Sequence, residues 1–232
     1  MEIMVPMVVE TRVANLWDAH NVISRVYHAE PKDRLLLRVA HDLPVDGAII
    51  EIGTGSGHST CALALGAKLA GKGKVYAIDW DIGQIASQNL LVEAYRRFDG
   101  AARWALLIQN VVYCGVHDWV RFIVCDSAEA WEWISLPCRL LFIDGAHSGE
   151  YVTKDMLRYG EFVVPGGMMF VHDYYLRGAT EDAGLIAYND AIREYLRDSS
   201  VWTEFIEYDR DLAGPRTLLC SVRKRLTDLG ES

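Results

Sequence analysis

The chain has little of what a nucleic-acid-binding or membrane protein needs. It carries 32 acidic residues against 23 basic ones, a formal net charge of −9, and no run of Lys and Arg long enough to form a basic patch. Such a protein repels a nucleic-acid backbone, and the short basic group 223–225 is expected to be a solvated tail. No apolar run approaches the length of a membrane span. We therefore expect neither a nucleic acid nor a membrane as partner.

Cysteine is scarce and shows no pairing pattern. The five cysteines have no C-x-x-C spacing and lie within apolar runs: Cys61, Cys114, Cys125, Cys138 and Cys220. This pattern favours reduced core residues and hence a cytoplasmic protein.

Low-complexity linkers and internal repeats are also absent. The chain has 232 residues, of which 51% are hydrophobic, and this is sufficient for one full core. We expect residues 47–232 to form a single domain and residues 1–46 to form an N-terminal helical extension. The apolar segment 1–9 is suited to docking on another subunit, which leaves a homo-oligomer open.

The sequence does contain a regular alternation of strand-like and helical segments, which is typical of a parallel sheet covered by helices. Strands are expected at 47–52, 74–79, 120–125, 139–144 and 167–172, and helices at 13–27, 32–43, 57–70, 84–97, 101–115, 128–134, 149–162 and 183–197. Two later β-rich runs, 201–208 and 217–222, flank a turn with Gly214 and Pro215 and are expected to pair as an antiparallel hairpin.

A loop with three glycines follows the first expected strand. Gly53, Gly55 and Gly57 allow positive φ and let a ligand approach the backbone without meeting a Cβ. The helix after the loop would turn its free N–H groups to that ligand, with Ser56 or Ser59 as the expected N-cap. The loop therefore predicts a bound cofactor.

The end of the next strand indicates what kind of cofactor this is. Asp79 follows Gly57 at the spacing expected of an acid that accepts hydrogen bonds from a ribose diol. The loop departs from the G-x-G-x-x-G pattern of dinucleotide sites, and Glu51 at its start is awkward beside a pyrophosphate. A nucleoside with a positive centre and no phosphate would tolerate Glu51. S-adenosylmethionine is such a cofactor.

The segment 49–60 resembles motif I of the class I S-adenosylmethionine-dependent methyltransferases. The resemblance implies an α/β fold with a doubly wound, mostly parallel, seven-stranded Rossmann-like sheet that ends in an antiparallel hairpin. It also implies which residues shape the methionine and ribose end of the cofactor pocket: Glu51, Gly53, Thr54, Gly55, Ser56 and Gly57.

The resemblance implies three further cofactor contacts. Asp79 would bind the ribose hydroxyls. Trp80 would pack on the adenine, unless it is an ordinary core or rim aromatic. Asp126 and Ser127 would approach the adenine amino group, unless Asp126 is simply a helix N-cap.

Polar groups crowd the ends of two later strands. One end reads Asp144-Gly145-Ala146-His147, and the other reads His172-Asp173 after a Pro-Gly-Gly turn. Together with Asp155 they resemble the D-G-x-H…D…P-G-G…D pattern of small-molecule O-methyltransferases, a branch that includes macrocin-type sugar methyltransferases and, more distantly, catechol-type enzymes. The branch implies that Asp144 lies by the cofactor and that His147, His172 and Asp173 face the methyl acceptor.

Two hypotheses about the chemistry stay open. In metal-dependent members of this branch, an Asp at position 144 and an acidic or amide pair at positions 172 and 173 bind Mg²⁺. A histidine nitrogen is a poor Mg²⁺ ligand, so Asp144, His172 and Asp173 would better suit Mn²⁺, Fe²⁺ or Zn²⁺. Alternatively, His147 or His172 is a general base that takes the proton of a substrate hydroxyl, with Asp144 orienting it.

The sequence thus predicts methyl transfer from S-adenosylmethionine to a hydroxyl of a small molecule such as a sugar, a phenol or a natural-product intermediate. The acceptor would be selected by residues 1–46 and by the loop 174–183. Two other classes are weighed against this prediction. An NAD-dependent oxidoreductase is disfavoured by the loop spacing and the hairpin, and a catalytically silent cofactor-binding scaffold would have the same fold.

Overall fold

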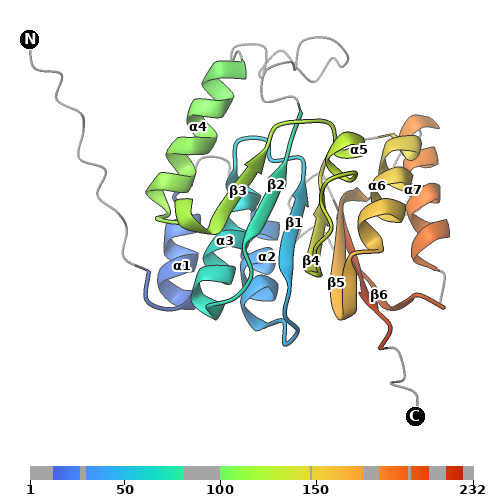
Figure 1. The fold of residues 1–232 in the computed structure, drawn as a ribbon, viewed down its shortest axis with the longest axis horizontal. Coiled ribbons are helices and arrows are strands. Elements are labelled where there is room, and N and C mark those ends of the chain that lie inside the picture. The colour runs from blue at the N-terminus through green and yellow to red at the C-terminus, as the bar shows by residue number, and fades with distance from the viewer. Residues whose placement is uncertain are drawn as a thin grey trace, which may run out of the picture.

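A single seven-stranded sheet organises the chain. The computed structural model describes residues 13–26, 30–80, 100–146, 148–174, 183–197, 200–208 and 218–226, with strand order β3-β2-β1-β4-β5-β7-β6. Five strands run parallel: β1 (Ala48–Ile52), β2 (Val75–Ile78), β3 (Val120–Ile123), β4 (Cys138–Ile143) and β5 (Val163–Tyr174). The last two, β6 (Trp202–Tyr208) and β7 (Leu218–Lys224), pair with each other antiparallel, and β7 pairs antiparallel with β5. The expected doubly wound sheet with a terminal antiparallel pair is confirmed (Figure 1).

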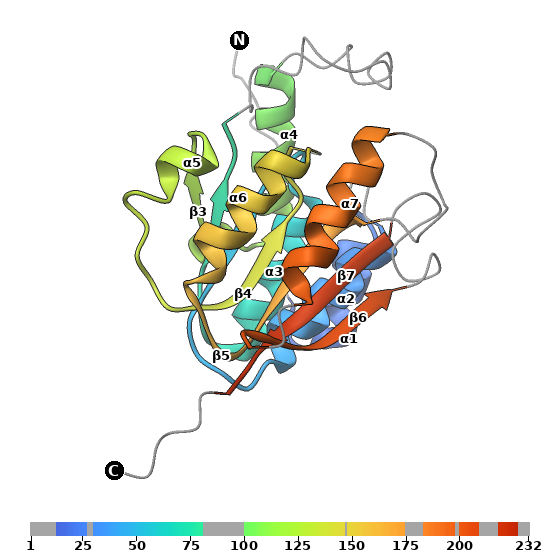
Figure 2. The ribbon, with the colours of Figure 1, turned by 90° about the vertical axis from the view of Figure 1, so that its right-hand side faces the viewer.

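Helices cover both faces of the sheet (Figure 1, Figure 2). One face carries α1 (Leu16–Ile23), α2 (Pro31–Asp42), α3 (His58–Ala70) and α4 (Gly100–Tyr113), and the other carries α5 (Ser127–Ala130), α6 (Gly149–Gly160) and α7 (Ala183–Leu196). A short 3₁₀ helix, His117–Trp119, precedes β3. Because side chains alternate along a strand, Leu140 and Phe142 of β4 join the first core while Leu141 and Ile143 join the second.

Helix α2 packs closely on α3. A Cβ at Gly66 of α3 would lie 2.4 Å from the carbonyl oxygen of Leu37, so only glycine allows this approach. Leu36, Leu37 and Ala40 of α2 belong to the same buried core as α3 and β1. The division of the chain at residue 46 stays a prediction, but α2 shares its core with the sheet.

Most expected elements lie within a few residues of the observed ones, and three expectations are wrong. The helix expected at 128–134 is shorter, since α5 ends at Ala130 and a turn follows. Strand β5 begins at Val163 and not at residue 167, so the Pro-Gly-Gly segment lies within the strand. The basic group 223–225 is no solvated tail: Arg223 pairs with Met168 across the sheet, and the Lys224 ammonium donates to the Gly160 carbonyl at 3.1 Å.

Some expectations fall on residues outside the described ranges: the helix 84–97, the turn with Gly214 and Pro215, and the segment 1–9. All five cysteines are free, and all but Cys125 are buried. Among the described residues, no helix has the length and apolar character needed to cross a membrane.

Candidate functional site

Asp144 and His172 lie side by side where β4 and β5 end. Ile143 of β4 is paired with Val171 of β5, so the two residues that follow are neighbours. The Nδ1 atom of His172 lies 2.9 Å from Oδ1 of Asp144 and 3.5 Å from Oδ1 of Asp173. Burial acts to lower the pKa of His172, but the charge and hydrogen bond of Asp144 and the charge of Asp173 together outweigh it, and the pKa is raised. A carboxylate therefore holds the imidazole by Nδ1.

Backbone strain supports this arrangement. Asp173 has a φ of 55°, a value that residues other than glycine adopt rarely. With this backbone conformation near the end of β5, Oδ1 of Asp173 lies 3.5 Å from Nδ1 of His172. Strain of this kind gathers at functional sites.

A lysine from the N-terminal helices reaches the same cluster. Lys32, in the first turn of α2, is 2% exposed, and its Nζ lies 3.3 Å from Oδ2 of Asp144 and 3.3 Å from Oε2 of Glu30. Burial acts to lower the pKa of Lys32, but the nearby carboxylates, Asp144 foremost, outweigh it and raise that pKa. The ammonium stays charged, and Asp144 lies between a lysine on one oxygen and a histidine on the other.

The first residue of α3 lies next to this cluster. Burial, with the positive charge of Lys32, lowers the pKa of His58 to about 4, so its ring is neutral near pH 7. Its Nδ1 lies 3.4 Å from Oγ of Ser56. Its Nε2 is buried and has no hydrogen-bond partner among the described residues.

The glycine loop has the backbone that its sequence predicts. Gly53, Gly55 and Gly57 take φ values of 84°, 51° and 85°. A Cβ on Gly53 would lie 2.2 Å from the carbonyl oxygen of Asp144, so the loop is pressed against the end of β4. This close contact joins the loop to the Asp144 cluster.

The N-terminus of α3 has no side-chain cap. Its N-cap residue is Gly57, which carries no hydrogen-bonding side chain for the first N–H groups of the helix. The serine caps expected from the sequence are wrong, because Ser59 lies inside the helix and donates to Asp33 of α2 at 3.2 Å, while Ser56 faces His58. The uncapped N–H groups fit the carboxylate of a cofactor.

Asp79 lies against the same loop. Its Oδ2 accepts hydrogen bonds from the Thr54 N–H at 2.8 Å, the Thr54 hydroxyl at 3.0 Å and the Gly55 N–H at 3.3 Å. Trp80, the next residue, is 60% exposed. The acid thus braces the loop, and the contacts of Asp79 with a ribose and of Trp80 with an adenine stay predictions.

Glu51 contacts the helix that follows the glycine loop. Its side chain is fully buried and accepts a hydrogen bond from the Thr60 hydroxyl of α3 at 2.6 Å. Burial raises the pKa of Glu51 well above its usual range. Its place at the methionine end of the pocket stays a prediction.

The residues expected at the adenine lie at the start of α5. Asp126 accepts from the Ala128 N–H at 2.7 Å and is the N-cap of this helix. The Ser127 hydroxyl donates to Oδ1 of Asp155 at 2.7 Å, and burial raises the pKa of Asp155 to about 6. These residues line a hollow of about 330 Å³. The contacts of Asp126 and Ser127 with an adenine stay predictions.

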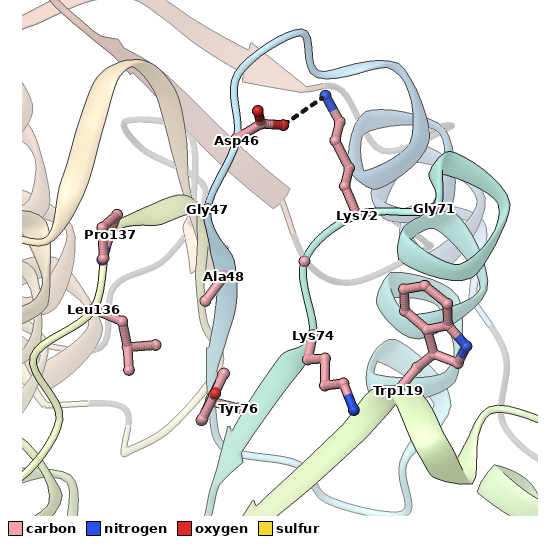
Figure 3. Close-up of a pocket in the computed structure, with 11 residues that line it drawn as sticks. Asp46, Gly47, Ala48, Gly71, Lys72, Lys74, Tyr76, Trp119, Leu136 and Pro137 are labelled. Atoms are coloured by element: carbon pink, nitrogen blue, oxygen red, sulfur yellow. Dashed lines mark ion pairs between the residues drawn. The ribbon is translucent and has the colours of Figure 1, made fainter.

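A larger hollow of about 620 Å³ lies at the opposite edge of the sheet, where the strands begin (Figure 3). Asp46 and Lys72 form an ion pair of 3.5 Å at its rim. In open α/β sheets the ligands bind beyond the carboxyl ends of the strands. Because the glycine loop and the Asp144 cluster lie at that other edge, we place the site there and not in this hollow.

Three residues of the cluster form a candidate set of ligands for a divalent metal. Asp144, His172 and Asp173 each offer a ligand atom, and these atoms lie within 4.8 Å of one another. The distances suit a cation, but the Lys32 ammonium already lies 3.3 Å from Asp144 and places a positive charge there. Nδ1 of His172 contacts Asp144, so it would have to give up that contact and its proton to bind a metal itself. This arrangement does not fit a divalent metal.

Three residues of this site were missed by the sequence prediction: Glu30, Lys32 and His58. A signal for Lys32 was present, because Lys32, Leu36 and Ala40 are spaced by four and share one face of a helix. A charged residue in an otherwise apolar stripe points to a buried partner. His147 lies outside the described residues, so its place at the acceptor stays a prediction.

Comparison with known families agrees with this geometry. A family model described as a methyltransferase domain matches residues 50–174. The matched stretch begins in β1 and ends in β5, and it includes the glycine loop, Asp79, Asp144 and His172.

Solved structures share the fold at low sequence identity. The O-methyltransferase TomG from Streptomyces achromogenes, involved in tomaymycin synthesis and solved in complex with SAM, is 18% identical with a TM-score of 0.59, over 93% of this chain and 92% of that chain. An O-methyltransferase from Bacillus cereus in complex with SAH is 14% identical with a TM-score of 0.58, over 96% and 94%. A cofactor-bound protein from MTB is 18% identical with a TM-score of 0.64, over 91% and 90%.

Proposed function

The chain belongs to the methyltransferase-domain family as a class I S-adenosylmethionine-dependent methyltransferase, and from that premise we propose that it methylates a hydroxyl of a small molecule. One observation carries this proposal, the position of Asp144. Its carbonyl lies against Gly53 of the glycine loop, while its carboxylate contacts Lys32 and His172. A single residue therefore joins the cofactor loop to a cluster that can orient and deprotonate a hydroxyl.

The proposed reaction is an in-line displacement. The acceptor oxygen attacks the sulfonium methyl carbon, the C–S bond breaks as the O–C bond forms, and S-adenosylhomocysteine leaves. Most of the acceleration comes from aligning the two reactants. We assign the hydroxyl proton to Nε2 of His172, because Nδ1 contacts the Asp144 carboxylate, which stabilises the imidazolium that forms. His147 and Asp173 are proposed to face the acceptor.

The remaining parts of the proposal concern substrate and setting. We propose a sugar, a phenol or a natural-product intermediate as acceptor. The net charge of −9 supports a role without nucleic acid, and the five free cysteines support a cytoplasmic location. Membrane independence and a homo-oligomer formed through residues 1–9 rest on the sequence alone. An NAD-dependent oxidoreductase has no support from the family match.

Calorimetry with S-adenosylmethionine tests the cofactor site. We expect saturable binding in the wild type and a loss of about 10-fold or more in Asp79→Ala, because Asp79 holds Thr54 and Gly55 and would also bind the ribose. Asp118→Ala, an acid exposed outside the site, should bind like the wild type. An unchanged affinity of Asp79→Ala for S-adenosylmethionine would contradict the assignment of the cofactor site.

The methyl-transfer step is tested with labelled cofactor and a panel of sugars and phenols. Transfer of label to a hydroxyl supports the proposed function. A protein that binds the cofactor tightly and labels no acceptor in the panel would instead be the silent scaffold.

A further inference from the structure

We propose that Lys32 is the resident cation of this site: its ammonium neutralises Asp144, keeps a divalent metal ion out and makes methyl transfer independent of metal. The inference rests on the proposed function and adds a positioning residue to it. It also decides between the two hypotheses that the sequence left open for Asp144, His172 and Asp173.

The contacts of Lys32 are those of a structural charge and not of a surface lysine. The side chain is 2% exposed, and its Nζ lies 3.3 Å from a carboxylate oxygen of both Asp144 and Glu30. Burying an ammonium is costly unless opposite charges compensate for the lost water. The carboxylates of Asp144 and Glu30 therefore compensate for the burial of the Lys32 ammonium, and this ammonium places a positive charge beside Asp144.

The position of Lys32 is held by the packing of α2 on α3. Asp33, the next residue, is fully buried, accepts a hydrogen bond from the Ser59 hydroxyl of α3 at 3.2 Å and accepts one from the Glu30 N–H at 2.6 Å. Farther along the helix pair, the close approach of Gly66 to Leu37 fixes α2 again. Because the helix that carries Lys32 is held at these two places, the lysine has few alternative positions.

The charge of Lys32 bears on both hypotheses, the divalent metal and the general base. A divalent ion held by Asp144 and Asp173 would lie within a few ångströms of Nζ, where like charges in a site shielded from water repel strongly. At the same time, Lys32 contacts Oδ2 of Asp144 while His172 contacts Oδ1. The carboxylate is thus held from two sides, which fixes the orientation of the imidazole that we assign as the base.

The test is a titration of the full-length protein with Mn²⁺, followed by electron paramagnetic resonance. We expect no saturable Mn²⁺ binding in the wild type and no loss of methyl transfer after treatment with a chelator. Lys32→Met removes the positive charge with little change in side-chain shape, so it should gain Mn²⁺ binding and lose about 10-fold or more in kcat/KM. Lys32→Arg keeps the charge and should exclude Mn²⁺ like the wild type.

Lys72→Met is the matched control, because it makes the same substitution at the opposite edge of the sheet (Figure 3). It should leave Mn²⁺ exclusion and transfer unchanged. Saturable Mn²⁺ binding by the wild type that Asp144→Asn abolishes would overturn the proposal, and this measurement needs no Lys32 variant to fold. A folded Lys32→Met protein that still excludes Mn²⁺ would also overturn it. Absence of transfer to every acceptor would contradict the proposed function but leave the Mn²⁺ results readable.

Discussion

Burial makes several acids in this protein harder to ionise. Glu51 and Asp155 both lie out of water, and burial raises the pKa of each. Each also accepts a hydrogen bond from a hydroxyl, from Thr60 and Ser127 respectively, which fails to offset the burial. Each of these carboxyls is therefore harder to ionise than an exposed acid, and stability should depend on pH where they titrate.

Asp155→Asn tests this at one residue. The folded-state pKa of Asp155 is about 6, above the ordinary value of 3.8, so its contribution to stability is fully present below pH 3.8 and is lost as the pH rises to about 6. Two pKa units correspond to about 3 kcal/mol, and asparagine, which does not titrate, lacks this loss. Urea unfolding between pH 3.5 and 8 should show the wild type losing stability relative to Asp155→Asn within that window.

The same series with Asp118→Asn is the control, because that acid is exposed. A difference between the wild type and Asp155→Asn that stays constant across the whole pH range would show that Asp155 is not held as a buried acid.

The glycine loop from β1 to α3 lies in close contact with the end of β4 and with α4. Gly53 and Gly57 have φ values that other residues rarely adopt, and each also has no room for a Cβ. At Gly53 the obstacle is the backbone of Asp144, which has no way to rotate aside as a side chain would. Gly71, at the far end of α3, has a similar φ of 68° and open space around it. A comparison of Gly53 with Gly71 therefore separates the effect of backbone strain from that of steric contact.

Gly53→Ala should be more damaging than Gly71→Ala. The left-handed conformation costs about 1–2 kcal/mol at either position. Alanine at Gly53 also forces a backbone shift worth a further ~1–3 kcal/mol. Thermal unfolding and calorimetry with S-adenosylhomocysteine should show a larger loss of stability and weaker binding in Gly53→Ala, and unchanged binding in Gly71→Ala. Equal losses of stability in the two variants would contradict the close contact between the loop and Asp144.

At the scale of the whole molecule, the parallel sheet has two unlike edges. The carboxyl edge has the glycine loop, Asp79 and the ion-paired cluster, whereas the opposite edge has the larger hollow. The volume of a hollow alone would place the ligand at the edge that lacks these polar groups. Because the central strands run parallel, their carboxyl ends meet at one edge of the sheet, and the polar groups converge there.

Hydrogen–deuterium exchange with S-adenosylhomocysteine tests which edge holds the cofactor. Binding to the folded state suppresses opening motions near the ligand. Protection should therefore rise at residues 53–57 and 144–146 and stay unchanged at 71–74. Increased protection confined to 46–48 and 71–74 would place the ligand in the larger hollow instead.

Much of the fold follows from local signals. The glycine spacing marks the turn from β1 to α3, and the apolar runs mark the central strands. The site is less predictable. Asp144 and His172 were placed correctly at adjacent strand ends, because parallel strands bring their ends to one edge. Lys32 was not, because nothing near it in the chain shows that its partner lies 112 residues away.

By itself the sequence determined the layered α/β architecture, the cofactor loop and the strand ends that carry the polar cluster. These depend on the periods of strands and helices and on where glycine is needed, which are properties of short segments. Only the tertiary structure decided that Glu51 is fully buried with a raised pKa, that Ser59 contacts α2 and does not cap α3, and that the Lys32 ammonium lies beside Asp144. Burial and charge pairing decide these points, and both arise when distant segments pack together.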